Sequence, residues 1–309
     1  MTHAPDDDRT AHVLPDVATA AADDPAYPTF PAQVPTVELR EGRYAVRYAR
    51  HLRELDDILR LRFDVFNLEL GEGLDSAFET GRDIDAFDGV CHHLLVVDVE
   101  DDDRIVGTYR LQTGDMARRH RGFYSATEFD LSGLLDAAGD DAIEVGRACV
   151  HRDHRNTQVL FLLWRGLAQY MLHNRKRYLF GCCSLTSQNV AEGRAVMAHL
   201  EKRGLVHPTL RVEPLPACRC YDGAPPIDPS IKVHIPKLFR TYLRHGALVC
   251  GPPAIDRLFK TIDYLVVFDV QAMDERQVRT FFGERRRRSK RADAGSPSDP
   301  PGDARRDSA

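Results

Sequence analysis

The chain contains no apolar run approaching the roughly 20 residues that a membrane-spanning helix requires. Its N-terminal stretch also lacks the basic segment and the apolar core of a secretion signal. We therefore expect a cytoplasmic protein whose contact with a membrane, if it makes one, is peripheral.

The seven cysteines do not form a disulfide framework, because Cys182 and Cys183 are adjacent and one residue separates Cys218 from Cys220. Without an export signal, we expect all of them to be reduced thiols. Cys218 and Cys220 with His207 offer three ligands, whereas a closed zinc site needs four. The sequence therefore predicts no metal.

The chain is not basic overall, since its formal net charge is −5 at pH 7. This charge excludes a nucleic-acid-binding protein that depends mainly on bulk electrostatics. Basic residues are instead concentrated locally, at His151, Arg152, His154 and Arg155.

Composition divides the chain into three parts. Residues 1–39 are acidic, rich in Ala and Pro, and typical of a disordered leader. Residues 284–309 form a basic tail that is either solvated or, through RRRRSKR, a contact with the anionic inner membrane. Between them we expect one domain at residues 40–283, with a C-terminal extension from about residue 206.

Apolar periodicity predicts a mixed α/β sheet flanked by helices. Residues 93–99 and 105–112 form a predicted hairpin through the acidic turn EDDDR. Residues 143–150 form the central strand, and residues 158–174 the helix after it. The other predicted elements are strands at 44–50, 178–185 and 264–270, helices at 51–70, 189–203, 236–245 and 274–282, and a short helix and turn at 123–137.

The central strand AIEVGRACV carries Glu144 and Arg147 among small and apolar residues. Burying a charge costs several kcal/mol unless the charge is paired or used. The two residues are therefore either an internal ion pair or part of a catalytic site. A strand that leads into a long helix also presents backbone N–H groups to a phosphate, which indicates a phosphate-bearing carrier.

The order of these elements resembles the fold of the GCN5-related N-acetyltransferases, in which two strands splay apart to admit a thioester. Six segments together resemble the ornithine-lipid N-acyltransferases: RLRFDVF, DIDAFD, HHLLVVD, GTYRL, EVGRACVH and LFGCCSL. That resemblance implies transfer of a 3-hydroxy fatty acyl chain from acyl carrier protein to the α-amine of ornithine, giving a lyso-ornithine lipid. It implies no cofactor beyond the acyl-phosphopantetheine arm of the carrier protein.

The acyl-homoserine-lactone synthases are a related family and indicate which positions to examine. No tryptophan occurs in residues 68–74, where those synthases usually carry one, so the lipid branch is favoured. By this resemblance the catalytic residues are Glu144, Arg147 and Arg110, and the substrate-binding residues are Arg62, Phe66, Asp85 and Asp88.

Each of these residues has a plausible chemical role and a structural alternative. Glu144 is the candidate base that deprotonates the substrate ammonium, or else an ion-pair partner of Arg147 or Arg110. Backbone N–H groups near residues 148–150 would stabilise the oxyanion. Asp85 and Asp88 would bind the two amines of a diamino acid, or else tie their loop to Arg62 or Arg110. Arg62 would receive the substrate carboxylate, or else form an ion pair on the helix surface.

The loop after the central strand lacks the glycines with which acetyltransferases wrap a pyrophosphate. A phosphopantetheine arm has a single phosphodiester, so the loop favours acyl carrier protein as donor over coenzyme A. The residues expected to contact the carrier are His151, Arg152, Arg155, Asn156 and Thr157. The competing predictions are an acetyl-CoA-dependent small-molecule N-acetyltransferase, a lactone synthase and a non-catalytic acyl-binding protein.

Overall fold

The computed structural model describes residues 27–223 and 225–282. The predicted basic tail and residues 1–26 of the predicted leader lie outside the described residues. The boundary predicted at residue 40 is wrong, because the chain already packs on the domain from residue 27. Val34 is 3% exposed in the main core, and the carbonyl oxygen of Thr29 lies 2.6 Å from Nε2 of His92.

A single large sheet organises the fold, with strand order β1-β2-β3-β4-β6-β7-β11-β10. The strands are β1 (Leu39–Glu41), β2 (Tyr44–Tyr48), β3 (His92–Asp98), β4 (Arg104–Thr113), β6 (Ala142–Val150), β7 (Tyr178–Leu185), β10 (Ala254–Asp256) and β11 (Thr261–Asp269), and β9 (Leu248–Val249) pairs with β11. The short strands β5 (Phe129–Asp130) and β8 (Glu213–Pro214) form a separate pair. Among these described strands, only β6 and β7 pair in parallel.

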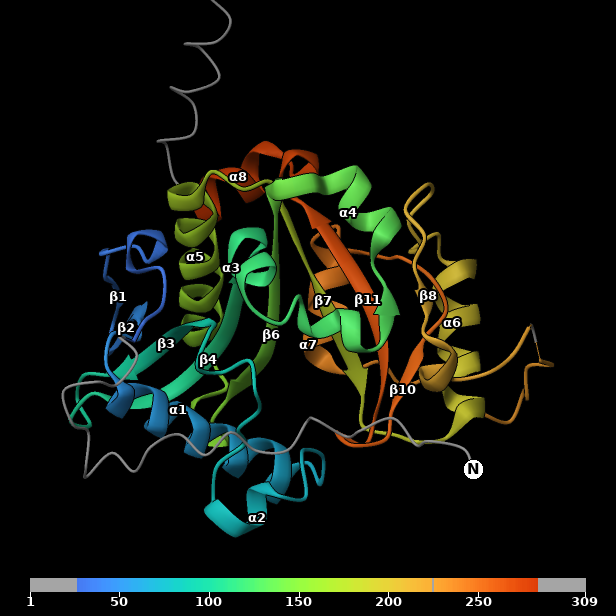
Figure 1. Cartoon of the computed structure of the whole chain (residues 1–309), viewed down its shortest axis with the longest axis horizontal. Coiled ribbons are helices and arrows are strands. Elements are labelled where there is room, and N and C mark those ends of the chain that lie inside the picture. The colour runs from blue at the N-terminus through green and yellow to red at the C-terminus, as the bar shows by residue number, and fades with distance from the viewer. Residues whose placement is uncertain (1–26, 224, 283–309) are drawn as a thin grey trace, which may run out of the picture.

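Helices cover both faces of this sheet (Figure 1). The apolar side chains of α5 (Thr157–Asn174), α6 (Val190–Lys202), α7 (Lys237–Arg244) and α8 (Glu275–Phe282) fill two cores on one face. The other face is covered by α1 (Leu52–Phe63), α3 (Gly114–Arg119) and α4 (Ser132–Ala138). A π-helical turn (Asp64–Glu69) continues α1, and α2 (Ala77–Thr80) follows it at the base of the view.

The helix after the central strand begins as its sequence predicts. The side chain of Asn156 accepts a hydrogen bond of 3.0 Å from the backbone N–H of Val159, which satisfies one free donor of the first turn. Nine residues of α5 are buried, more than one helical stripe supplies, because α5 is covered by the sheet and by α8. No described helix is both long and apolar enough to cross a membrane.

The sheet has two irregularities near its centre, and both involve β6. Strands β6 and β7 pair only from Ala142 to Glu144 and then separate. Gly181 lies where they part, and a Cβ there would be 2.1 Å from the carbonyl oxygen of Val145. On its other edge, β6 has one extra residue between Gly146 and Cys149, so that a β-bulge interrupts its pairing with β4. The fold thus has an opening and a distorted strand side by side.

Candidate active site

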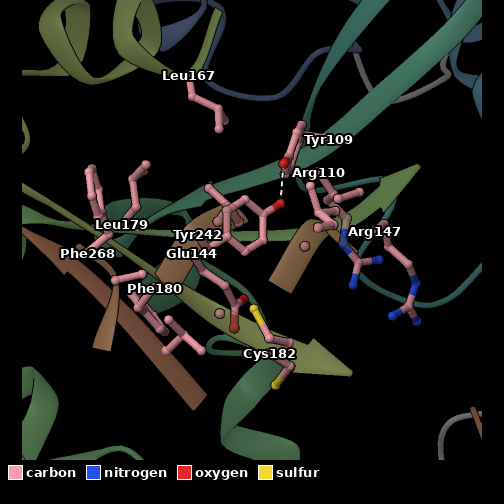
Figure 2. A pocket seen from close by; sticks show the side chains of 18 of the residues that line it. Tyr109, Arg110, Glu144, Arg147, Leu167, Leu179, Phe180, Cys182, Tyr242 and Phe268 are labelled. Carbon is pink, nitrogen blue, oxygen red and sulfur yellow. Dashed lines mark hydrogen bonds between the residues drawn. The ribbon is translucent and has the colours of Figure 1, made fainter. Parts of the chain in front are cut away.

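A cavity of about 330 Å³ occupies the opening between β6 and β7, a volume typical of small-molecule sites. Its walls include Tyr109 and Val145 from the face covered by α5, and Glu144 and Cys182 from the opposite face. The cavity therefore passes through the sheet. Figure 2 shows Glu144 and Cys182 close together, with Arg110 and Arg147 to one side.

Glu144 is 6% exposed and lines the cavity from β6. Its two carboxylate oxygens accept hydrogen bonds of 2.7 Å each from the backbone N–H groups of Tyr124 and Ser125. Burial raises the pKa of Glu144 above its ordinary value, although those contacts and Arg110 oppose the rise. A raised pKa beside a cavity suits a proton acceptor. In the described structure neither Arg110 nor Arg147 forms an ion pair with Glu144, so the predicted alternative role does not apply.

Three arginines and three aspartates form a charged cluster beside Glu144. Arg62 contacts Asp83 at 2.6 Å and Asp88 at 2.5 Å, and all three side chains are 0% exposed. Arg110 contacts Asp85 at 2.6 Å and Asp88 at 3.0 Å, and Arg147 contacts Asp85 at 2.8 Å. We use "charged cluster" for this set: Arg62, Asp83, Asp85, Asp88, Arg110 and Arg147. Its formal charges cancel.

The charged cluster corrects part of the predicted substrate site. Arg62 is fully buried and all of its nitrogens contact aspartates, so no face is free to receive a substrate carboxylate. Asp85 and Asp88 tie their loop to the arginines, which was the alternative role, and neither lines the cavity. Arg62 and Arg110 hold the pKa of Asp88 well below its ordinary value, against the effect of burial. Binding of amines by the two aspartates stays a prediction that this geometry does not favour.

Arg147 occupies the β-bulge and faces the cavity. Its φ angle is +49°, a conformation that costs a side-chain-bearing residue roughly 1–2 kcal/mol. The guanidinium lies 4.7 Å from the ring centre of Tyr124 and 4.3 Å from that of Phe259, besides its contacts with aspartates. These contacts fix the bulge. Ala148 follows on the cavity wall, close to the predicted oxyanion-stabilising stretch.

Phe66 lies in the cavity wall as well, which brings it together with Arg110, Glu144 and Arg147. It belongs to the π-helical turn after α1, and its ring packs edge-on at 5.4 Å from Phe259. Four of the seven predicted catalytic and substrate-binding residues therefore line one cavity. The other three lie in the charged cluster behind it.

The end of the cavity toward α5 is apolar. Trp164 and Leu167 of α5 line it, together with Phe268 of β11 and Phe281 of α8. The hydroxyl groups of Tyr109 and Tyr242 are hydrogen-bonded within the cavity wall, as Figure 2 shows. Of the apolar residues of α5, Trp164, Leu167, Ala168 and Met171 line the cavity.

The predicted carrier-binding residues follow β6 and lead into α5. Arg155 forms a bidentate ion pair with Glu69, at 2.6 and 2.8 Å, and donates to the carbonyl oxygen of Val150. Asn156 caps α5, and Thr157 is its first residue. Of the remaining two, His151 precedes a 3-10 turn, and Arg152 begins that turn and is exposed.

A second group of buried acids escaped sequence analysis. Glu128, Asp263 and Cys182 bring their oxygen and sulfur atoms within 4.8 Å of one another. Asp263 interrupts the apolar strand TIDYLVV, and this signal could have singled it out as it did Glu144. The cysteines considered as metal ligands have other contacts: Cys218 donates to the carbonyl oxygen of Thr127 at 3.7 Å.

This sheet, with a cavity between two splayed parallel strands and a buried carboxylate beside it, defines an acyltransferase of the GNAT class. The family model described as "Acetyltransferase (GNAT) domain" matches residues 61–165. The fold class predicted from the sequence is confirmed.

Two enzymes with curated names are similar over most of the chain. The L-ornithine N(alpha)-acyltransferase of Agrobacterium fabrum is 33% identical over 259 residues, which cover 80% of this chain and 88% of that enzyme. The enzyme of the same name from Rhodobacter capsulatus is 35% identical over 254 residues, 78% of this chain and 95% of its own. The chain belongs to the L-ornithine N(alpha)-acyltransferase family, and the resemblance drawn from its motifs is confirmed. Among solved structures, the AHL synthase LasI shares 13% identity with a TM-score of 0.43, covering 78% of this chain and 95% of that one.

Proposed function

We propose that this chain joins a 3-hydroxy fatty acyl group, delivered by acyl carrier protein, to the α-amine of ornithine and so makes a lyso-ornithine lipid. The observation that carries the proposal is that one continuous cavity reaches from an apolar end, at Trp164 and Leu167, to Glu144. Such a cavity can hold an acyl chain with its thioester carbon near a proton acceptor. The names of the relatives supply ornithine as the amine.

The reaction needs a neutral amine, and we propose that Glu144 produces it by accepting a proton. In the proposed step the α-ammonium gives a proton to Glu144, directly or through water, and the amine nitrogen attacks the thioester carbon. A C–N bond forms, the C–S bond breaks, and the phosphopantetheine thiol leaves with a proton. Because Glu144 is buried, its affinity for the proton is raised, which assists the first step.

Arg147 is our candidate for binding the substrate carboxylate. It lines the cavity, and its Nε forms no hydrogen bond with the described residues, although Oδ2 of Asp83 lies 3.4 Å away. Arg110 lies beside it in the charged cluster and also reaches the cavity wall. A guanidinium recognises a carboxylate through paired N–H groups, so this place favours an amino acid over a simple amine.

The donor is proposed to be acyl carrier protein, with its phosphopantetheine arm entering past the start of α5. The exposed Arg152 and the residues around it would meet the acidic surface of the carrier. No cofactor is proposed beyond that arm. We also propose that the product is released at the inner membrane by a peripherally attached enzyme, and sedimentation with anionic vesicles would measure that attachment.

The donor can be tested by offering the full-length protein ornithine and either 3-hydroxyacyl carrier protein or the matching acyl-CoA, with the amide followed by mass spectrometry. We expect the carrier protein to be far more efficient, and its advantage to shrink as salt screens the basic residues. Arg152→Gln should slow the reaction with carrier protein only, whereas Arg53→Gln, an exposed arginine on α1, should change neither. Equal efficiency with both donors at every salt concentration would contradict the proposal and favour the acetyl-CoA-dependent alternative.

A further inference from the structure

Two buried carboxylates near the cavity carry oxygens that no hydrogen-bond donor of the described residues matches, although Oδ2 of Asp263 accepts a hydrogen bond of 3.3 Å from the hydroxyl of Thr261. Glu128 is 1% exposed, and neither of its carboxylate oxygens has a hydrogen-bond partner among the described residues. Asp263 is 3% exposed, and its Oδ1 likewise has none. Three acceptor oxygens therefore lie together in the interior without a donor, which is rare in a folded protein.

The other acids of the site each contact a cation or a hydrogen-bond donor, although Oδ1 of Asp83 also lacks a hydrogen-bond partner among the described residues. Asp83, Asp85 and Asp88 contact arginines, and Glu144 accepts two backbone N–H groups. Apart from burial, the strongest influences on the Glu128 carboxyl come from Asp263 and Asp256, which are acids themselves. Burying a charge without a partner is costly. The carboxylates of Glu128 and Asp263 therefore either bind a cation or hold a proton instead of one.

The unmatched acids are close to the site of acyl transfer. Asp263 of β11 lines the same cavity as Glu144. Cys182 is near both acids, because its sulfur lies within 4.8 Å of a carboxylate oxygen of Asp263 and 3.5 Å from the hydroxyl of Ser125, the residue whose N–H binds Glu144. Figure 2 shows Cys182 next to Glu144. A short, flexible substrate can therefore contact both places at once.

We propose that Glu128 and Asp263 form the subsite for the side-chain ammonium of the amino-acid substrate. An ammonium group carries three N–H donors, and the subsite offers three unmatched oxygens. With its α-amine at Glu144 and its carboxylate at Arg147, a diamino acid then has a partner for each charged group. The inference rests on the proposed function, because it names how that reaction selects its amine.

A metal ion fits the same group less well. The third member, Cys182, is a soft ligand beside two hard carboxylates, and three ligands leave a structural zinc site incomplete. Burial also raises the pKa of the Cys182 thiol well above its ordinary value, which disfavours the thiolate that a metal would require. Burial raises the pKa of Asp263 to about 6 and the pKa of Glu128 well above its ordinary value, so the pair can hold a proton that an arriving ammonium replaces.

The test compares ornithine with norvaline, which has the same carbon chain without the side-chain amine. We expect the wild-type protein to prefer ornithine by at least about 100-fold in kcat/KM, as a site built to bind a polar group rejects an analogue that lacks it. Asp263→Asn and Glu128→Gln should raise the KM for ornithine at least tenfold and reduce that preference, with little change for norvaline. Because each variant removes an unmatched buried carboxylate, we expect both to fold, and thermal unfolding checks this. Asp130→Asn, an exposed acid on β5, is the matched control and should keep the preference.

Different results identify different errors. If the wild-type protein acylates ornithine and both variants keep the full preference over norvaline, the subsite is wrong and the proposed function stands. If the wild-type protein acylates no amino acid with either donor, the proposed function is wrong. Calorimetric titration with Zn²⁺ or Mg²⁺ covers the remaining alternative: tight binding that Asp263→Asn abolishes, with the ornithine preference unchanged, would overturn the ammonium subsite in favour of a metal site.

Discussion

Replacing Glu144 by glutamine tests the proposed proton acceptor with the smallest possible change in shape. The amide cannot take a proton from the substrate ammonium at neutral pH. Loss of a general base typically costs ~10²–10⁴-fold in rate, which corresponds to about 3–5 kcal/mol of barrier. We expect kcat to fall within that range, with the KM for the acyl donor nearly unchanged.

The structure also gives the effect of this change on stability. Glu144 accepts N–H groups at both carboxylate oxygens, whereas a glutamine keeps one acceptor and turns an NH₂ group toward the second donor. An unsatisfied buried donor costs about 1–3 kcal/mol, and the variant no longer buries a charge, which offsets part of that cost. We therefore expect Glu144→Gln to fold. Thermal unfolding, with Glu100→Gln in the exposed β3–β4 turn as control, separates lost catalysis from lost structure.

The assay is formation of acyl-ornithine from acyl carrier protein, followed by mass spectrometry across a range of pH. Because burial raises the pKa of Glu144, the wild-type rate should fall below that raised pKa as the carboxylate becomes protonated. The variant should lose this acidic limb and keep the rise at high pH that comes from the substrate amine. Near wild-type turnover at neutral pH with the acidic limb intact would remove Glu144 from the mechanism.

Two further substitutions test the packing around the site. Arg62→Met should leave Asp83 and Asp88 buried without the arginine that binds both of them and lower the free energy of unfolding by about 3–5 kcal/mol, measured by urea denaturation. A loss below about 1 kcal/mol would contradict the importance of the charged cluster for stability. Ala168→Leu, on the apolar wall of the cavity, should displace about three methylene groups of the acyl chain, each contributing about 0.8 kcal/mol to binding. We expect kcat/KM to fall by roughly 30-fold or more for long acyl donors and by less for short ones. An unchanged dependence of kcat/KM on chain length would place the acyl group elsewhere.

Much of the fold could be predicted from the sequence because its central elements have strong periodicity. The strand predicted at residues 178–185 is β7, with the same bounds, and the helix predicted at 158–174 is α5, which begins one residue earlier. The elements that were missed are short. Helix α3 has six residues and β9 has two, and their stability comes from packing rather than from a local pattern.

The family resemblance supplied Arg110 and Phe66, whereas the sequence pattern by itself indicated site residues only where a charge interrupts an apolar strand. Glu144 and Arg147 were found in this way, and Asp263 carries the same signal. Glu128 does not, because the mixed segment YSATEFD has no apolar run for it to interrupt, and its burial comes from the tertiary fold. The partners of Asp85 and Asp88 were also open, since ion pairing and substrate binding need the same residue types. Only the three-dimensional structure shows that arginines already occupy both aspartates.

The charged cluster and the bulge together explain how the opening in the sheet is kept. Two parallel strands that part after three residue pairs lose backbone hydrogen bonds and would otherwise tend to close. Arg147 is held at a positive φ by aspartates from the loop after α2, and Arg110 and Arg62 bind the same loop. These ion pairs lie outside the cavity, so β6 could move toward β7 only by breaking them. Breaking a buried ion pair is costly because it leaves a charge without its partner. Asp85 and Asp88, for which the sequence left substrate binding and loop anchoring open, therefore help to hold the strand that carries Glu144 in position. In the described structure the pair Glu128 and Asp263 makes no such contact with an arginine of the charged cluster, and it is the pair that we propose binds the substrate.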